Sequence, residues 1–319
     1  MKVLVIADRD LDGSGSAAII NLYHKVTGDT PVTVQFPMRN SLNAQFKDAK
    51  AVKKLAIDYD LIYLCDTGVD SSEGIRNLTS ILGPKLIYFD HHQTNYEGTK
   101  ARSDNFLGYH VIEGDRCTAK ITFDVLLESL SPNRDGYQEF KEAAEFAMLV
   151  NDLDMWIRDY ERSSELGDIV AVLGPDHAYL EFEECVTNAY HNSEIMQEAI
   201  ETAHMRKFKS LQLAKETLVK HKGYKAPLYT AICRGYGSEV SHTLVHDEGL
   251  IVLYDTTSGT MSLRRGDTVN TKDSEVSCLD FASLFGGGGH PFAAGFPAEK
   301  VLKQMSQVMG QYMIKEWKK

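Results

Sequence analysis

Three short apolar runs near the start of the chain each lead into an aspartate. They are residues 2–7, 61–65 and 86–89, followed by Asp8, Asp66 and Asp90. Runs of this length, rich in Val, Ile, Leu and Tyr, are typical of buried strands. In an open parallel sheet, ligands bind just beyond the carboxyl ends of the strands. Three strands that deliver carboxylates there would build a dense anionic cluster, which is stable only around cations. The pattern therefore predicts a metal site.

The rest of the first half alternates strands with helices. A strand is expected over 32–36, and helices are expected from near Ser14, across 43–56 and across 71–82. This rhythm predicts a parallel sheet with helices on both faces, in the α/β class.

The second half begins with helix-compatible stretches and then changes pattern. Residues 118–150 and 177–222 favour helices, with Gly and Pro concentrated between them at 167–175. Strands are expected at 227–232, 249–255 and 260–264, followed by a helix over 299–318. A chain of 319 residues suggests two domains. We expect a first domain over 1–190, a helical linker over 191–222, and a smaller C-terminal α/β domain over 223–319.

Charge and cysteine content limit the class of protein. The formal net charge is −11, and no Lys/Arg run forms the basic stripe of a protein that tracks long nucleic acids. The five scattered cysteines lack any Cys-x-x-Cys spacing, which is typical of reduced thiols. With neither a membrane-spanning run nor a secretory signal, we expect a cytoplasmic protein without a membrane partner.

The first Asp-rich segment carries three alternating carboxylates, Asp8, Asp10 and Asp12, before Gly13. In an extended segment, alternate side chains share one face, so the three would converge. A calcium-binding EF-hand loop is excluded because its twelfth position is Ile19 instead of glutamate.

The triplet Asp90-His91-His92 adds imidazoles to the same edge of the sheet. Carboxylate and imidazole ligands suit Mn²⁺ or a similar divalent ion. Many carboxylates around two metal ions is the arrangement found in phosphatases and nucleases.

Two further segments are candidates for the site. Asp152 and Asp154 follow a helix-like stretch and could supply one more carboxylate, although composition alone favours polar residues that simply end a helix. In the second half, Arg264 ends an expected strand and suits phosphate contact. A glycine run suits close backbone approach to a phosphate or base, and it comprises Gly286, Gly287, Gly288 and Gly289, followed by His290.

Taken in order, these motifs resemble the DHH phosphoesterases that carry a C-terminal DHH-associated substrate-binding domain. The resemblance implies a phosphodiesterase with two divalent metal ions, Mn²⁺ being favoured and Mg²⁺ or Co²⁺ being alternatives, and an active site between the domains. It implies Asp10 and Asp12 as ligands of separate metals, Asp66 as the bridge, and His91 as a ligand of the second metal. The metal ligands it implies are Asp8, Asp10, Asp12, Asp66, His91 and Asp152, with Asp154 as the alternative to Asp152.

The resemblance assigns catalysis to Asp66, Asp90 and His92, with His92 beside the scissile phosphate. It assigns substrate binding to Arg264, His290 and the backbone of Gly286–Gly289. One departure concerns Ile6, which stands where many oligoribonucleotide-cleaving members have a histidine. Asp8 precedes the Asp-x-Asp pair instead, as in the single-strand exonuclease branch.

From this we expect hydrolysis of short linear oligonucleotides or dinucleotides to mononucleotides by metal-activated water. Alternatives are a single-strand exonuclease, a cyclic-dinucleotide phosphodiesterase, a phosphomonoesterase for a small nucleotide, and a non-enzymatic nucleotide-binding regulator. A short nucleotide is the expected partner, and long duplex nucleic acid is not. Base preference, cleavage polarity and oligomeric state, a homodimer included, are left open.

Overall fold

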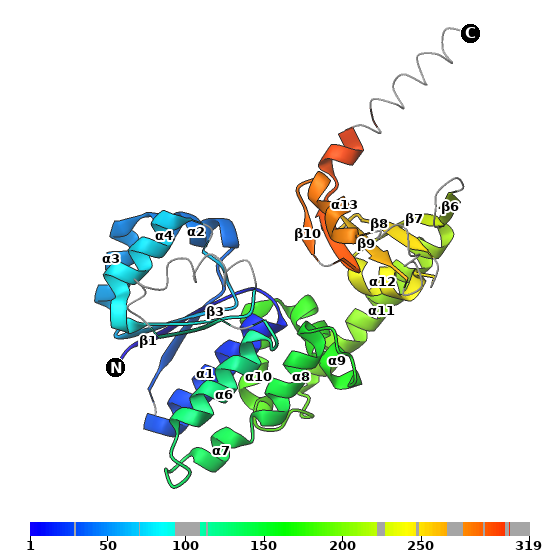
Figure 1. The fold of residues 1–319 in the computed structure, drawn as a ribbon. Helices are drawn as coiled ribbons and strands as arrows, with labels where there is room; N and C mark the ends of the chain where they lie inside the picture. Colours follow the sequence, from blue (N-terminus) through cyan, green and yellow to red (C-terminus); the bar gives the residue numbers. More distant parts are fainter. Residues whose placement is uncertain are drawn as a thin grey trace, which may run out of the picture. The chain divides into compact units, whose positions relative to one another are not determined.

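The computed structural model describes residues 1–28, 30–69, 71–92, 109–112, 114–221, 227–246, 249–266, 277–289, 291–303 and 306. The chain divides into two compact units, Met1–Ala203 and His204–Lys319 (Figure 1). The division falls within the long helix α11 (Glu194–Glu216), which lies inside the segment expected to be a linker.

The first unit contains a five-stranded parallel sheet in the order β2-β1-β3-β4-β5. Its strands are β1 (Val3–Ala7), β2 (Val32–Gln35), β3 (Leu61–Cys65), β4 (Leu86–Asp90) and β5 (Tyr109–Ile112). Ala7 pairs with Cys65, and Cys65 pairs with Phe89, so the three neighbouring strands β1, β3 and β4 end level with one another. The predicted parallel sheet is confirmed, and the aspartates that follow these strands share one edge.

Helices cover both faces of this sheet (Figure 1). Alternate residues of β1 enter separate cores: Val3 and Val5 pack with α1, α6, α8, α9 and α10, whereas Leu4 and Ile6 pack with α2, α3 and η1. Burial on both faces explains why the strands read as continuous apolar runs. The helical elements are α1 (Leu11–Gly28), α2 (Arg39–Lys47), α3 (Ala49–Asp58), α4 (Ser72–Asn77), the π-helix η1 (Leu78–Leu82), the 3₁₀ turn η2 (Gly83–Lys85), α6 (Thr118–Ser129), α7 (Tyr137–Lys141), α8 (Ala144–Asp154), α9 (Glu161–Leu173) and α10 (Pro175–Cys185).

Three helix predictions differ from the structure. The helix expected over 43–56 is two helices, because Asp48 ends α2 and its side chain caps α3 by accepting from the Lys50 N–H at 2.9 Å. The helix expected over 71–82 is α4 followed by the π-helix η1. The Gly/Pro-rich segment 167–175 holds most of the second half of α9, and the break comes only at Gly174, directly before α10.

The second unit contains a six-stranded mixed sheet in the order β10-β11-β9-β8-β7-β6. Its strands are β6 (Val219–His221), β7 (Leu228–Cys233), β8 (Leu250–Asp255), β9 (Thr260–Arg265), β10 (Gly288–Gly289) and β11 (Ala293–Pro297). Only β7 and β8 pair in parallel among these described strands. Helix α12 (Gly237–Leu244) packs on one face and α13 (Cys278–Leu284) on the other. Of the helix expected over 299–318, residues 299–303 and 306 are described, and they are helical.

All five cysteines are buried and form no disulfide. Within the described ranges, no helix is both long and apolar enough to cross a bilayer.

Candidate metal centre

The first Asp-rich turn is shaped by a glycine. Helix α1 begins at Leu11, so the segment curls back instead of staying extended, and the Asp10 carboxylate accepts the Gly13 N–H at 3.0 Å. A Cβ atom at position 13 would lie 2.3 Å from the backbone oxygen of Asp8. Only glycine fits there, and this close approach brings the Asp8 and Asp10 side chains to the same side of the turn as Asp66.

Asp12 lies in the first turn of α1 and is fully buried. Its Oδ2 accepts the Thr118 N–H at 2.7 Å, and its Oδ1 accepts the Ala119 N–H at 2.6 Å. These two amides open α6, where backbone N–H groups lack intrahelical acceptors. These amides, at the positive end of the α6 helix dipole, therefore fix the orientation of the Asp12 carboxylate.

Asp66 follows β3 in the left-handed backbone region, with φ of 56°. Aspartate tolerates this region better than most residues. Its N–H donates to the Phe89 carbonyl at 3.0 Å, which fixes the turn against β4. The buried carboxylate accepts a 3.2 Å hydrogen bond from the Thr118 hydroxyl.

Asp90 orients the second histidine of the triplet. Its Oδ1 lies 2.8 Å from His92 Nδ1 and also accepts the backbone N–H groups of His91 and His92. Its Oδ2 lies 2.7 Å from the Tyr88 hydroxyl. Asp90 is fully buried, so it acts on the site through His92.

His91 points into the carboxylate cluster. Its Nε2 lies 3.4 Å from Asp66 Oδ1, 3.4 Å from Asp154 Oδ2 and 3.7 Å from Asp12 Oδ2. His92 is more exposed, at 45%, and its ring centroid lies 4.6 Å from that of His91. Both imidazoles thus reach the shared edge, as the sequence predicts.

The structure brings Asp154 to the cluster, and not Asp152. Asp152 is buried and accepts the Asp159 N–H at 2.9 Å and the Ser163 hydroxyl at 2.5 Å, which ties the end of α8 to the start of α9. Its assignment as a metal ligand therefore does not fit the geometry. Asp154 Oδ2 is buried, and no hydrogen bond to it is found among the described residues.

Seven side chains form one connected set, which we call the Asp/His cluster. It contains three groups of three residues, and within each group the ligand atoms lie within 4.8 Å of one another. Asp66 belongs to two of these groups, and His91 also belongs to two. Carboxylate oxygens with one or two imidazoles match the donor set of Mn²⁺, and the orphaned Asp154 oxygen suits coordination of a cation. The groups are Asp8/Asp10/Asp66, Asp66/His91/His92 and Asp12/His91/Asp154.

The pKa values record the crowding of negative charge. Burial and the neighbouring carboxylates raise the pKa of Asp66 well above its usual range. Burial, followed by Asp12 and Asp10, raises the pKa of Asp154 to about 8. The pKa values of Asp12 and Asp10 are raised for the same reasons, although part of Asp10 remains exposed. Without a cation the cluster favours protonated carboxyls.

The two histidines titrate in opposite directions. Burial lowers the pKa of His91, which keeps its Nε2 available as a neutral ligand. The hydrogen bond to Asp90 raises the pKa of His92. Burial raises the pKa of Asp90, but hydrogen bonds from His92 and Tyr88 outweigh it and leave that pKa lowered. His92 and Asp90 therefore form an ion pair at the rim.

The second unit carries the candidate substrate residues on neighbouring strands. Arg264, in β9, is half-buried and pairs in register with Ala293 of β11, which in turn pairs with β10. A Cβ atom at Gly287 would lie 2.1 Å from the Gly295 carbonyl oxygen, whereas one at Gly288 would meet open space. His290 lies outside the described residues.

Residues that position the cluster were missed in the sequence. Tyr88 is one, although its spacing of two from Asp90 along a strand places both on one face and could have signalled it. The amides of Thr118 and Ala119 carry no such signal, because any residue other than proline supplies an N–H.

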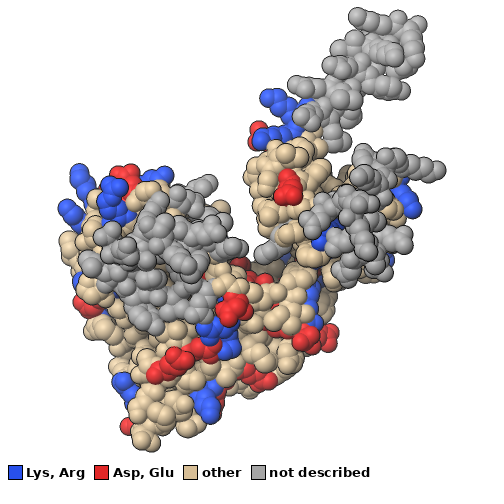
Figure 2. Space-filling view, in the orientation of Figure 1, with Lys and Arg blue, Asp and Glu red and all other residues tan. Residues whose placement is uncertain are grey.

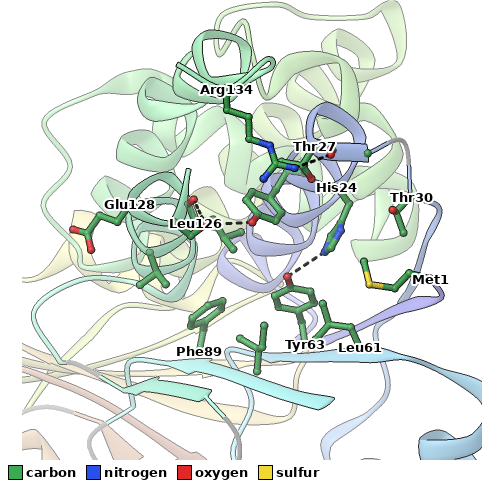
Figure 3. A pocket seen from close by; sticks show the side chains of 15 residues that line it. Met1, His24, Thr27, Thr30, Leu61, Tyr63, Phe89, Leu126, Glu128 and Arg134 are labelled. Atoms are coloured by element: carbon green, nitrogen blue, oxygen red, sulfur yellow. Dashed lines mark hydrogen bonds between the residues drawn. The ribbon is translucent and has the colours of Figure 1, made fainter. Parts of the chain in front are cut away.

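A separate cavity of about 650 Å³ lies between α1, α6 and the strands β3 and β4 of the first unit (Figure 3). It is lined by Leu61 and Ile87 among others. Its His24 and Tyr63 side chains lie 3.1 Å apart in a buried hydrogen bond, and Arg134 donates to the Thr27 carbonyl. These polar groups bond to the protein itself and add nothing to the metal centre.

Comparison with family models gives one match. The DHH family, N-terminal domain, matches residues 2–150. The first unit therefore contains a DHH family N-terminal domain. The match does not reach Asp154 or the second unit. A comparison with curated protein sequences finds no match.

Two solved structures of RecJ share the α/β fold at low sequence identity. Exonuclease RecJ bound to manganese is 16% identical with a TM-score of 0.54, covering 93% of this chain and 85% of that chain. RecJ in complex with Mn²⁺ from Thermus thermophilus is 15% identical with a TM-score of 0.52, and the match covers 93% of this chain and 49% of that chain. The pGpG-specific phosphodiesterase PggH from Vibrio cholerae is 11% identical with a TM-score of 0.49, covering 98% of each chain.

Proposed function

We propose, from the DHH family N-terminal domain and the Asp/His cluster, that this chain is a Mn²⁺-dependent phosphodiesterase of short linear oligonucleotides. The observation that carries the proposal is the position of Asp66. It belongs both to the group with Asp8 and Asp10 and to the group with His91 and His92. A carboxylate shared by two ligand groups is what a two-metal hydrolase needs.

The ligand sets divide around Asp66. Asp8 and Asp10 would hold the first ion with Asp66. Asp12, His91 and Asp154 would hold the second ion, which Asp66 would share because its Oδ1 lies 3.4 Å from His91 Nε2. Bound ions of this kind activate a water molecule and neutralise charge on the phosphoryl oxygens.

The remaining residues act on the substrate. Asp90 holds His92 with its Nδ1 engaged, so a protonated His92 presents its other ring nitrogen to a phosphate or leaving oxygen. Arg264 of the second unit would bind a phosphate of the substrate, and the glycine run would let the phosphate approach the backbone.

Charge supports a short substrate. A net charge of −11 disfavours tracking along a polyanion. On the face drawn in Figure 2, the described residues present both signs of charge and no continuous basic band.

A second candidate function is single-strand exonuclease activity. It is favoured by Asp8, which belongs to the Asp/His cluster. Ile6 stands where many oligoribonucleotide-cleaving DHH phosphoesterases have a histidine, and Asp8 precedes the Asp-x-Asp pair instead, as in the exonuclease branch. This function would bring stronger cleavage of longer strands and a steep salt dependence.

Turnover assays with Mn²⁺ on a linear dinucleotide, a single-stranded ten-mer and a cyclic dinucleotide test the proposal. We expect the highest kcat/KM on the dinucleotide and no turnover by Asp66→Ala. Faster cleavage of the ten-mer would favour the exonuclease. Metal binding without cleavage of any of the three would instead point to a nucleotide-binding regulator.

A further inference from the structure

We infer that Trp156 and Arg158 form a stacking platform for a nucleobase of the substrate, next to the metal centre. The inference rests on the proposed function, since it names the part of the substrate that the loop after Asp154 would recognise. This loop, residues 155–160, connects α8 to α9 and lies wholly within the first unit.

The loop begins at the metal centre. Asp154 is the last residue of α8, and its carboxylate belongs to the Asp/His cluster. Two trans peptide units separate it from Trp156, so their Cα atoms lie at most about 7.6 Å apart. An indole at that position is within reach of a base whose phosphate is held at the cluster.

The backbone of the loop is held in an unusual conformation. Trp156 and Arg158 both have positive φ, 59° and 60°, which is rare for large side chains. The Asp152 carbonyl accepts the N–H groups of Ile157 and Arg158 at 2.9 and 3.2 Å, and the Asp152 carboxylate accepts that of Asp159. Strained backbone that the surroundings enforce in this way is concentrated at functional sites.

These hydrogen bonds give a role to the buried Asp152, which is not part of the Asp/His cluster. Its carboxylate and carbonyl fix both ends of the turn that carries Trp156 and Arg158. Asp152 therefore acts as a positioning residue for the loop, while Asp154, two residues on, faces the cluster.

The two side chains make a cation–π contact. The Arg158 guanidinium carbon lies 3.5 Å from the centroid of the Trp156 ring. Trp156 is 36% exposed and Arg158 is half-buried. Aromatic rings and guanidinium planes are the groups on which proteins stack single-stranded bases, and the guanidinium charge also suits a nearby phosphate.

Stacking of this kind tolerates any base, because every base has a flat π surface. The platform would therefore confer preference for a nucleotide over a simple phosphodiester, with little choice among bases. Loss of one stacked base costs about five- to 150-fold in binding.

The kinetic test compares Trp156→Ala and Trp156→Phe with Ile157→Ala, a control in the same loop that is 51% exposed. The substrates are a dinucleotide and dinucleotides in which either nucleoside is replaced by an abasic sugar. Trp156→Ala should lower kcat/KM for the dinucleotide about tenfold or more, mainly through KM. For the abasic dinucleotide that lacks the stacked base, Trp156→Ala should change kcat/KM little. Trp156→Phe and Ile157→Ala should keep most of the activity on the intact dinucleotide. Equal losses on all three substrates, or no loss, would overturn the platform.

A binding test stands apart from catalysis. The chain has two tryptophans, so Trp317→Phe leaves Trp156 as the sole tryptophan fluorophore. Nucleoside monophosphate should quench its emission, whereas ribose 5-phosphate and inorganic phosphate should not. Calorimetric binding of nucleoside monophosphate without quenching would refute stacking. If wild-type protein cleaves no phosphodiester but quenching occurs, the proposed hydrolysis fails while the platform stands.

Discussion

Replacing Asp154 with asparagine should stabilise the metal-free protein at alkaline pH. Burial and nearby carboxylates raise the pKa of Asp154 from 3.8 to about 8. A carboxyl whose pKa is higher in the folded than in the unfolded protein contributes stability that is fully present at pH values below its pKa in the unfolded protein. That stability is lost as the pH rises from about 4 to about 8. An asparagine amide carries no charge at any of these pH values, so the variant avoids this loss.

The size of the effect follows from the shift. About four pH units at about 1.4 kcal/mol each set an upper limit of about 6 kcal/mol. The Asp154 side chain is 23% exposed and its titration is shared with the other carboxyls, so we expect about 2–3 kcal/mol. For a unit of this size that is about 4–12 °C in Tm.

The assay is thermal unfolding in chelator and in excess Mn²⁺, at several pH values from about 5 to about 8.5, which span the titration of Asp154. The two proteins should differ most at the alkaline end and converge toward the acidic end. Mn²⁺ at about a hundred times its Kd should stabilise wild type by about 2.7 kcal/mol, and Asp154→Asn should lose much of that gain.

Asp152→Asn is the matched control, two residues away on the same helix. It disturbs hydrogen bonds to the start of α9, so it should lower the free energy of unfolding by about 1–3 kcal/mol and keep the Mn²⁺ response. The reasoning is refuted if Asp154→Asn shows the same stability difference at both ends of the pH range, or if its Mn²⁺ response is undiminished.

Three further changes test other parts of the site. Asp66→Asn should reduce Mn²⁺ binding and lower kcat by at least about a thousandfold, because one carboxylate serves both ligand groups; near-normal turnover in a steady-state assay would contradict its bridging role. Gly13→Ala should lower the free energy of unfolding, measured in urea, by more than about 2 kcal/mol, because the added Cβ would clash with backbone atoms. The control Gly288→Ala places its Cβ in open space and should leave that free energy unchanged. Equal losses of stability in the two variants would contradict the packing argument. Asp90→Asn should lower the pKa of His92 in metal-free protein, as followed by NMR, because their hydrogen bond is what raises it; an unchanged titration would exclude this ion pair.

The ends of the strands could be predicted from the sequence because burial on both faces makes each strand a continuous apolar run. Asp66 and Asp90 stand where those runs stop, so their meeting at one edge follows from a parallel sheet. Asp12 reaches the Asp/His cluster, but not by the extended segment that the sequence predicts. Its carboxylate faces α6 from a helix, and not from an extended segment.

The choice between Asp152 and Asp154 could not be made from the sequence. Residues two apart on a helix point in nearly opposite directions, so one faces the cluster and the other faces α9. Only the packing of α8 decides which. Gly167 was equally ambiguous: a Cβ there would lie 2.4 Å from the Leu153 side chain. The glycine allows α9 to pack closely on α8, whereas its composition suggested a break.

The hydrogen bonds from Thr118 and Ala119 to Asp12 have a consequence for native-state hydrogen exchange. Amides in the first turn of a helix ordinarily exchange early, because they have no intrahelical acceptor. These two donate to a fully buried carboxylate, so their deuterium uptake should be as slow as that of the sheet. The exchange rates of the Thr118 and Ala119 amide protons thus report whether the Asp12 carboxylate is in place.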